Sequence, residues 1–158
     1  MSESLKSEFT IALDAMGGDL GPEIVILAAK ESLEKHDNLR IVFFGKEEEL
    51  DVLCKKNISD QKRINIVDAQ DVVEMSDSPV DSIRNKKNSS MRIAIDYLKE
   101  KKADACVSAG NTGALMATAK FVLKMLPGIN RPAIIAELPA KKKTVHMLDL
   151  GANITNDP

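Results

Sequence analysis

Residues 108–113 form a run of small and polar residues with the composition of an anion-binding turn. Gly110 and Gly113 allow the backbone to turn and approach a ligand, and Asn111 and Thr112 add an amide and a hydroxyl. If a helix begins here, its first N–H groups lack partners and its dipole favours an anion. The run therefore predicts a site for an anion, phosphate above all, or else an ordinary strand-to-helix turn, because neither common phosphate-loop pattern is met.

A second predicted helix start carries hydroxyl and basic side chains. Ser89 and Ser90 precede an apolar stripe at helical spacing that begins at Met91. Arg84 and Lys87 come shortly before the two serines, in a long polar segment over residues 68–88. Basic groups and hydroxyls at a helix start suit an oxyanion, although the pattern is also typical of a surface loop followed by a serine N-cap.

Four further side chains have both a chemical and a structural interpretation. Asp14 and Asp149 follow apolar strand residues, so each either orients a lysine or arginine or caps a loop. His146 could act as a general acid that protonates a leaving thiolate. Cys106 is interpreted as a buried apolar residue, because no neighbour in sequence would lower the pKa of its thiol.

The overall composition and net charge argue against several classes of function. The formal net charge is -2 and only 3% of residues are aromatic, so neither a basic field nor stacking surfaces favour binding to nucleic acid. Two cysteines cannot form a disulfide framework, and no cluster has metal-ligand spacing, so we predict no metal. No apolar run approaches the ~20 residues that span a bilayer, and residues 1–8 lack the apolar core of a signal peptide. We therefore expect a cytoplasmic protein.

The elements that must position these residues alternate between strand and helix. Strands are predicted near residues 9–13, 40–44, 64–67, 105–108, 132–136 and 145–150, the first four of them parallel. Helices are predicted to begin near Pro22, Lys46, Ser90 and Asn111. Helical connections imply a three-layer α/β/α fold with a mainly parallel sheet, in a chain of one domain over residues 1–158. The short loop at 139–143 predicts an antiparallel hairpin near the C-terminus.

Five stretches, taken together, resemble the PlsX family of bacterial phosphate acyltransferases. They are residues 12–19, 83–84 with 89–92, 105–116, 131–133 and 148–153. The resemblance implies a homodimer and a fold similar to that of phosphate acetyltransferases and of isocitrate and isopropylmalate dehydrogenases. Members of this family continue well beyond the last stretch, so we expect a truncated chain, the N-terminal portion of a longer protein that stops before its sheet is covered.

The resemblance also implies a reaction, the transfer of a fatty acyl group from acyl carrier protein to orthophosphate without a cofactor. The product, acyl phosphate, would be consumed by a membrane-embedded glycerol-3-phosphate acyltransferase on the route to phosphatidic acid. The protein would then be cytoplasmic or peripheral at the membrane. Two alternatives stay open: a catalytically incomplete fragment that binds phosphate or dimerises, and a phosphate acetyltransferase-like enzyme that uses acyl-CoA.

The candidate site residues form two sets on this interpretation. Phosphate is already a nucleophile, so the reaction needs positioning and donors for the developing oxyanion. The catalytic candidates are Asn111, Thr112 and Lys87. The candidates for binding phosphate or the acyl donor are Arg84, Ser89, Ser90, Gly110, Gly113, Asp14, Gly17, Gly18, Asp19, Asp149 and Asn153, with Lys86 as a helper.

Overall fold

The structure is a computed structural model that describes residues 8–141 and 143–149. The chain divides into two units, residues 1–123 and residues 124–158, and each is described by itself. The first unit contains the α/β sheet and the second contains a β-hairpin.

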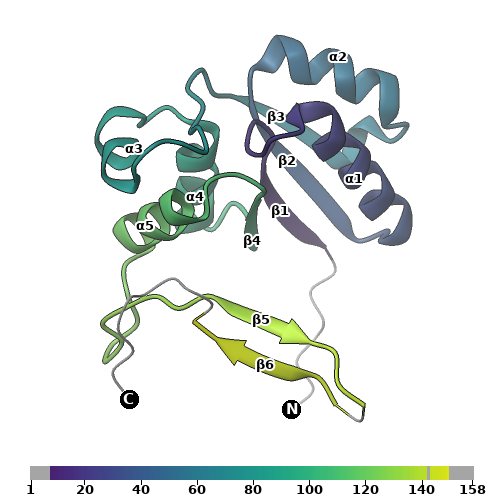
Figure 1. Ribbon diagram of the computed structural model, residues 1–158. Helices are drawn as coiled ribbons and strands as arrows, with labels where there is room; N and C mark the ends of the chain where they lie inside the picture. The colour runs from purple at the N-terminus through teal and green to yellow at the C-terminus, as the bar shows by residue number, and fades with distance from the viewer. Residues whose placement is uncertain (1–7, 142, 150–158) are drawn as a thin grey trace. The chain divides into compact units, whose positions relative to one another are not determined.

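Four parallel strands form the sheet of the first unit (Figure 1). They are β1 (Phe9–Asp14), β2 (Leu39–Gly45), β3 (Ile64–Asp68) and β4 (Ala105–Ser108), in the spatial order β3-β2-β1-β4. β2 is buried continuously from Ile41 to Gly45, as expected of a parallel strand that is covered on both faces. The prediction that the first four strands are parallel is therefore confirmed.

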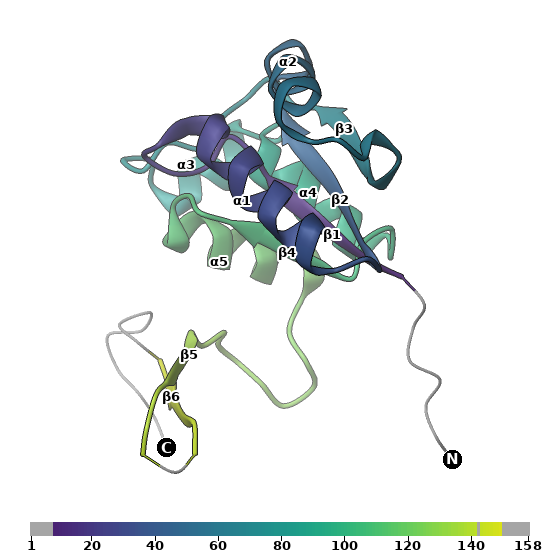
Figure 2. The same cartoon turned by 90° about the vertical axis from the view of Figure 1, so that its right-hand side faces the viewer.

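Helices cover both faces of this sheet, as Figures 1 and 2 show. They are α1 (Gly21–Lys35), α2 (Glu47–Asn57), α3 (Pro79–Asn85), α4 (Ser90–Lys99) and α5 (Thr112–Leu123), with a short 3₁₀ turn at Gln61–Arg63. Alternate residues of β2 divide the core in two. Ile41 and Phe43 pack with α1 and α2, whereas Val42 and Phe44 pack with α4. The predicted α/β/α layers are thus confirmed.

The second unit contains an antiparallel hairpin of β5 (Ile135–Leu138) and β6 (Val145–Leu148). The predicted antiparallel pairing is confirmed, but the first strand is placed three residues too early, because pairing with β6 begins at Ile135 opposite Leu148. The hairpin is largely exposed, and its exposed apolar side chains include Met147 and Leu148.

The structure adds two features of the helices to the sequence predictions. Residues 68–88 are not entirely irregular, because α3 forms within them, with Ser78 as its N-cap and Pro79 in its first turn. A polar helix of this length leaves little apolar periodicity in the sequence. α5 ends at Leu123, and the next residue, Lys124, adopts a left-handed φ of +70°.

Candidate functional site

Three segments meet at the carboxyl edge of the parallel sheet, where ligands bind in folds of this kind. Residues 15–20 follow β1, residues 69–78 follow β3, and residues 109–111 lead from β4 into α5. The residues expected to carry the chemistry come from these segments and from the start of α4.

Asn111 has both ends of its side chain engaged within the protein. Its Oδ1 accepts a hydrogen bond of 2.9 Å from the Ala114 N–H and so caps α5. Its Nδ2 lies 2.9–3.2 Å from the carbonyl oxygens of Glu74, Met75 and Asp77. Asn111 therefore ties the segment after β3 to the start of α5.

The backbone at the start of α5 is more open to a ligand than the Asn111 amide is. In the described part of the chain, the N–H groups of Thr112 and Gly113 have no hydrogen-bond partner, whereas Ala114 donates to Asn111. Gly113 is also close to a neighbour, because a Cβ at this position would lie 3.3 Å from Pro79 Cγ. Free amides at a helix start, together with the helix dipole, are suited to an anion.

The start of α4 is enclosed by the same segment. Ser89 and Ser90 are each only 1% exposed, and the Ser89 hydroxyl accepts a hydrogen bond from the Arg92 N–H at 3.3 Å. The Ser90 N–H donates to the Asp71 carbonyl at 3.2 Å. The predicted serine cap is present, and residues 71–77 contact the starts of both α4 and α5.

The basic residues between α3 and α4 have different environments. Arg84 and Lys87 are exposed, so their side chains are accessible to an anion. Lys86 instead donates to the Val72 carbonyl at 2.7 Å and to the Asp77 carboxylate. That hydrogen bond, together with one from the Glu74 N–H, lowers the pKa of Asp77 below its usual value. Lys86 therefore holds the segment after β3 in place.

The two glycine-bearing loops contact each other through buried polar groups. Asp14 is 1% exposed and accepts hydrogen bonds from the Gly17 N–H at 3.2 Å and from the Ser108 hydroxyl at 2.7 Å. Ser108 Oγ in turn accepts from the Gly110 N–H at 3.1 Å. Asp14 thus caps a loop, one of the two roles that the sequence allows.

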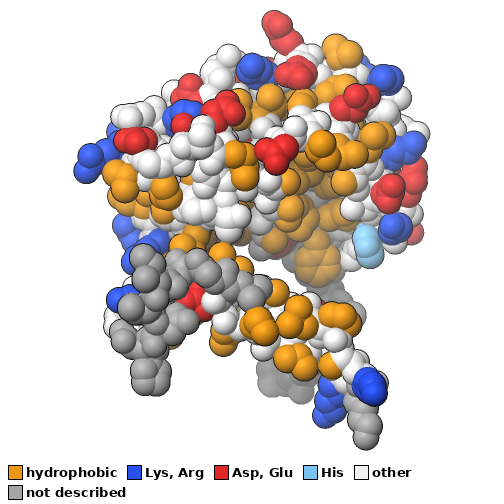
Figure 3. Space-filling view, in the orientation of Figure 1, with side chains coloured by type: hydrophobic (Ala, Val, Ile, Leu, Met, Phe, Trp, Pro, Cys, Tyr) orange, Lys and Arg blue, Asp and Glu red, His pale blue; other side chains and the backbone are white. Residues whose placement is uncertain are grey.

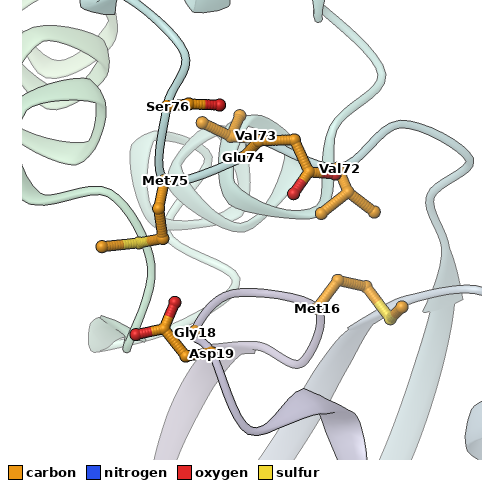
Figure 4. A pocket seen from close by; sticks show the side chains of 8 residues that line it. All are labelled: Met16, Gly18, Asp19, Val72, Val73, Glu74, Met75 and Ser76. Atoms are coloured by element: carbon orange, nitrogen blue, oxygen red, sulfur yellow. The ribbon is translucent and has the colours of Figure 1, made fainter.

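A pocket of about 420 Å³ lies between the loop after β1 and the segment after β3 (Figure 4). Met16, Gly18 and Asp19 line one side, and residues 72–76 line the other. Gly18 has a φ of +101°, and a Cβ there would lie 3.2 Å from the Ala109 carbonyl oxygen, so this position requires glycine. The pocket therefore brings the candidate residues Gly18 and Asp19 together with a segment that the sequence showed only as polar.

The remaining candidates are Cys106 of β4 and three residues of the second unit. Burial, and to a lesser degree the Asp14 charge, raises the pKa of Cys106 to about 12, which disfavours a thiolate nucleophile. In the second unit, His146 Nε2 lies 3.0 Å from Glu137 Oε1 across the hairpin. Asp149 has a φ of +59° and its N–H donates to the Ile134 carbonyl at 2.6 Å. Asn153 lies outside the described residues.

Sequence reasoning missed several residues that build this edge. Asp71, Glu74 and Asp77 connect the starts of α4 and α5, and Ser108 connects two loops that are distant in sequence. The one available signal for the first group was the Ser78-Pro79 pair, a common helix start that would have divided the long polar segment.

Two kinds of feature are absent from the described residues, a metal-binding cluster and a membrane-spanning helix. Across residues 8–141 and 143–149, no group of three or more His, Cys, Asp or Glu side chains is arranged to hold a metal ion. Over the same residues, none of the helices has the length and apolar character needed to cross a membrane.

Comparison with known proteins identifies close relatives. The sequence model of a family described as Fatty acid synthesis protein matches residues 9–158. A phosphate acyltransferase of Methylococcus capsulatus is 57% identical over 148 residues, and one of Coxiella burnetii is 53% identical over 152. These alignments cover 92% and 94% of this chain but 43% and 44% of the relatives, so the chain spans less than half of their length.

A solved structure has the same fold. The phosphotransacetylase EutD of Staphylococcus aureus aligns with a TM-score of 0.56 at 20% identity, over 88% of this chain and 45% of that chain. The sequence match to the family model covers nearly the whole chain, and the curated relatives share half or more of its residues where they align. The chain therefore belongs to the fatty acid synthesis protein family, also called PlsX, whose matched relatives are named phosphate acyltransferases.

Proposed function

We propose that this chain supplies part of the active site of an enzyme that transfers a fatty acyl group from acyl carrier protein to orthophosphate. The product would be an acyl phosphate for phospholipid synthesis. The observation that carries the proposal is the meeting of residues 14–19 and 108–113 at one sheet edge, next to a pocket and two free helix amides. The names of the relatives support phosphate as the acyl acceptor.

The reaction needs no activated nucleophile from the protein. A phosphate oxygen attacks the thioester carbonyl carbon, the C–O bond forms, and the carbonyl oxygen becomes an oxyanion. The C–S bond then breaks and the thiolate leaves, taking a proton from solvent or from a general acid, for which His146 is the candidate. The protein contributes positioning and donors aimed at the oxyanion.

The residues take roles that follow from their exposure. The Thr112 and Gly113 N–H groups, with the Thr112 hydroxyl, stabilise the oxyanion or bind phosphate. Arg84 and Lys87 are exposed cations that bind phosphate. Asn111, Lys86, Ser89 and Ser90 position the segments around the pocket. Gly18 and Asp19 lie in one wall of the pocket, and Gly17 packs against the turn before α5. Asp149 and Asn153 belong to the proposed substrate-binding set.

The acyl donor distinguishes this proposal from a phosphate acetyltransferase-like enzyme, and turnover distinguishes both from a fragment that only binds phosphate or dimerises. The proposed partners are acyl carrier protein, a second copy of the chain and a membrane-embedded glycerol-3-phosphate acyltransferase that consumes the product. The proposed location is the cytoplasm or the membrane surface.

The test uses residues 9–158 grafted in place of the matching part of the Methylococcus capsulatus relative, because this chain spans less than half of that protein. The chimaera is incubated with labelled orthophosphate and either acyl carrier protein thioester or the matching acyl-CoA. Faster formation of labelled acyl phosphate from the carrier protein thioester supports the proposal. A preference for acyl-CoA contradicts it, and so does absence of turnover in a folded chimaera whose unmodified parent is active. The isolated chain is expected to bind phosphate weakly and to turn over little thioester.

A further inference from the structure

Asp14 and Ser108 form a buried link between two strands that are far apart in sequence. They are register partners at the carboxyl ends of β1 and β4, and the Ser108 hydroxyl donates to Asp14 Oδ2 at 2.7 Å. The other carboxylate oxygen, Oδ1, accepts from the N–H groups of Met16 and Gly17 at 3.3 and 3.2 Å. Because Ser108 Oγ accepts from the Gly110 N–H, one hydroxyl connects the turn after β1 to the turn before α5.

The two turns touch through their backbones at the same place. A Cβ on Gly17 would lie 2.9 Å from the Gly110 nitrogen and 2.6 Å from Asp14 Oδ2. A Cβ on Gly110 would lie 3.2 Å from Gly17 Cα. No side chain therefore fits between the turns, and the Asp14–Ser108 link determines their spacing.

The link is sensitive to loss of the hydroxyl. Asp14 is 1% exposed, and in the described part of the chain all its hydrogen-bond donors are uncharged, so each donor matters for a carboxylate buried away from water. Without the Ser108 hydroxyl, Asp14 Oδ2 and the Gly110 N–H both lose a partner. Gly110 is two residues before Thr112, so a shift there moves the free amides at the start of α5.

We propose that Ser108 is a positioning residue for acyl transfer, which acts through Asp14 and Gly110 and does not touch the substrate. It holds the turn after β1 against the start of α5, so that the Thr112 and Gly113 amides stay aimed at the reacting oxygen. This inference rests on the proposed function for its effect on catalysis, and on the hydrogen bonds alone for its effect on the two turns.

The first experiment measures amide hydrogen exchange in the isolated chain. Ser108→Ala is expected to speed exchange of the Gly110 and Gly17 amides by about 10-fold or more, since it removes one hydrogen bond and weakens the adjacent turn. Ser108→Thr, which keeps the hydroxyl, should restore slow exchange. The matched control is Ser32→Ala, which removes the hydrogen bond to Ala28 O on α1 and should change neither amide. Unchanged exchange in Ser108→Ala overturns the inference.

The second experiment measures turnover in the chimaera described above. Ser108→Ala should lower kcat by about 10- to 100-fold and change the KM for phosphate by no more than about 2-fold. The reason is that misplaced Thr112 and Gly113 amides would stabilise the transition state less. Ser108→Thr should recover most of the loss. A lowered melting temperature with kcat unchanged, or a raised KM with kcat unchanged, contradicts a positioning role. If the unsubstituted chimaera makes no acyl phosphate, the proposed function fails, while the exchange experiment still decides whether Ser108 links the turns.

Discussion

At the scale of single residues, a side chain at this site often has a structural partner as well as a proposed chemical role. Asn111 illustrates this, because its oxygen caps α5 while its amide group lies within hydrogen-bonding distance of three carbonyl oxygens. An amide has only two N–H groups, so these carbonyls already use its donor capacity. Substitution of Asn111 therefore affects stability together with turnover.

Asn111→Ala is expected to lower the free energy of unfolding by ~1–3 kcal/mol, the range for losing a helix cap together with hydrogen bonds to part-buried carbonyls. It should also lower acyl phosphate formation by about 10²-fold, the scale for losing an oxyanion donor or its positioning. Urea unfolding of the chain and turnover of the chimaera measure the two effects. Asn57→Ala removes one side-chain hydrogen bond, to Leu53 O on α2, and serves as the control. An Asn111→Ala variant with wild-type stability and turnover would contradict both roles.

Two adjacent lysines have different environments, so we expect one to act on stability and the other on phosphate binding. Lys86 contacts Val72 O and Asp77, whereas Lys87 is exposed. Lys87→Ala should raise the KM for phosphate several-fold and leave the melting temperature unchanged. Lys86→Ala should lower the melting temperature, because it releases residues 72–77. Steady-state kinetics and thermal unfolding distinguish the two. The reverse pattern would show that Lys86 is the phosphate ligand.

At the scale of elements, the segment between β3 and α3 connects the helix starts at the carboxyl edge of the sheet. It contributes Asp71 to the start of α4 and the carbonyls of Glu74, Met75 and Asp77 to Asn111. The pocket of Figure 4 has this segment as one wall. The segment therefore connects both helix starts to the wall of the pocket.

The segment should loosen in acid. The Lys86 hydrogen bond, and then the Glu74 N–H, lower the pKa of Asp77 in the folded protein. A lowered folded pKa means that the contribution of Asp77 to stability is present above its unfolded pKa of ~3.9 and is lost as the pH falls through the folded value. Exchange of amides 72–77 should therefore quicken below about pH 4, and Asp77→Asn should remove that pH dependence. Asp51→Asn, in an exposed ion pair with Lys55, is the control. Equal acid sensitivity in Asp77→Asn would exclude this carboxyl.

The turn between β1 and α1 gives a steric test of its contact with the turn before α5. Gly17→Ala would place a Cβ 2.6 Å from Asp14 Oδ2, so we expect ~1–3 kcal/mol of destabilisation and shifted backbone resonances at 108–110. In Gly21→Ala the new Cβ would meet no atom within 4 Å, so the φ of +73° is the source of strain. We expect about 1 kcal/mol of destabilisation and no shift of the backbone resonances at 108–110. Denaturant unfolding and NMR spectra provide the comparison. Identical spectral changes in the two variants would argue against contact between the turns.

At the scale of the first unit, the sheet has one face that its helices leave partly open. Hydrophobic side chains gather between α1 and β4 in Figure 3, and a groove of about 370 Å³ lies there. Val107 of β4 is 49% exposed and Ile24 of α1 is 47% exposed, although strands of parallel sheets are normally covered on both faces. This groove is an exposed apolar patch in the isolated chain.

The patch should make the isolated chain self-associate at high concentration. Val107→Thr keeps a β-branched side chain in the strand but adds a hydroxyl. It should raise the highest concentration at which the chain is still monomeric. Sedimentation velocity, with binding of a hydrophobic dye as a second readout, measures this. The control is Val52→Thr, an exposed valine that lies outside this groove on α2. A chain that stays monomeric at every concentration would contradict the prediction.

The sequence by itself determined the features that depend on neighbouring residues. A short apolar run followed by small residues and a helical stripe was enough to place β4 and the start of α5, because chain direction and hydrophobic period act locally. The serine cap of α4 followed from the same kind of local pattern. The parallel sheet followed because each strand is connected to the next through a helical segment.

Only the tertiary structure decided which polar groups meet. The hydrogen bond between Ser108 and Asp14 joins residues 94 positions apart, and it exists because the strand order places β4 beside β1. The contacts of Asn111 with residues 74–77 likewise depend on how a polar segment folds back over α5. Spacing along the chain carries little information on such long-range contacts. It therefore predicted where an anion site could form but not which amides remain free to bind the anion.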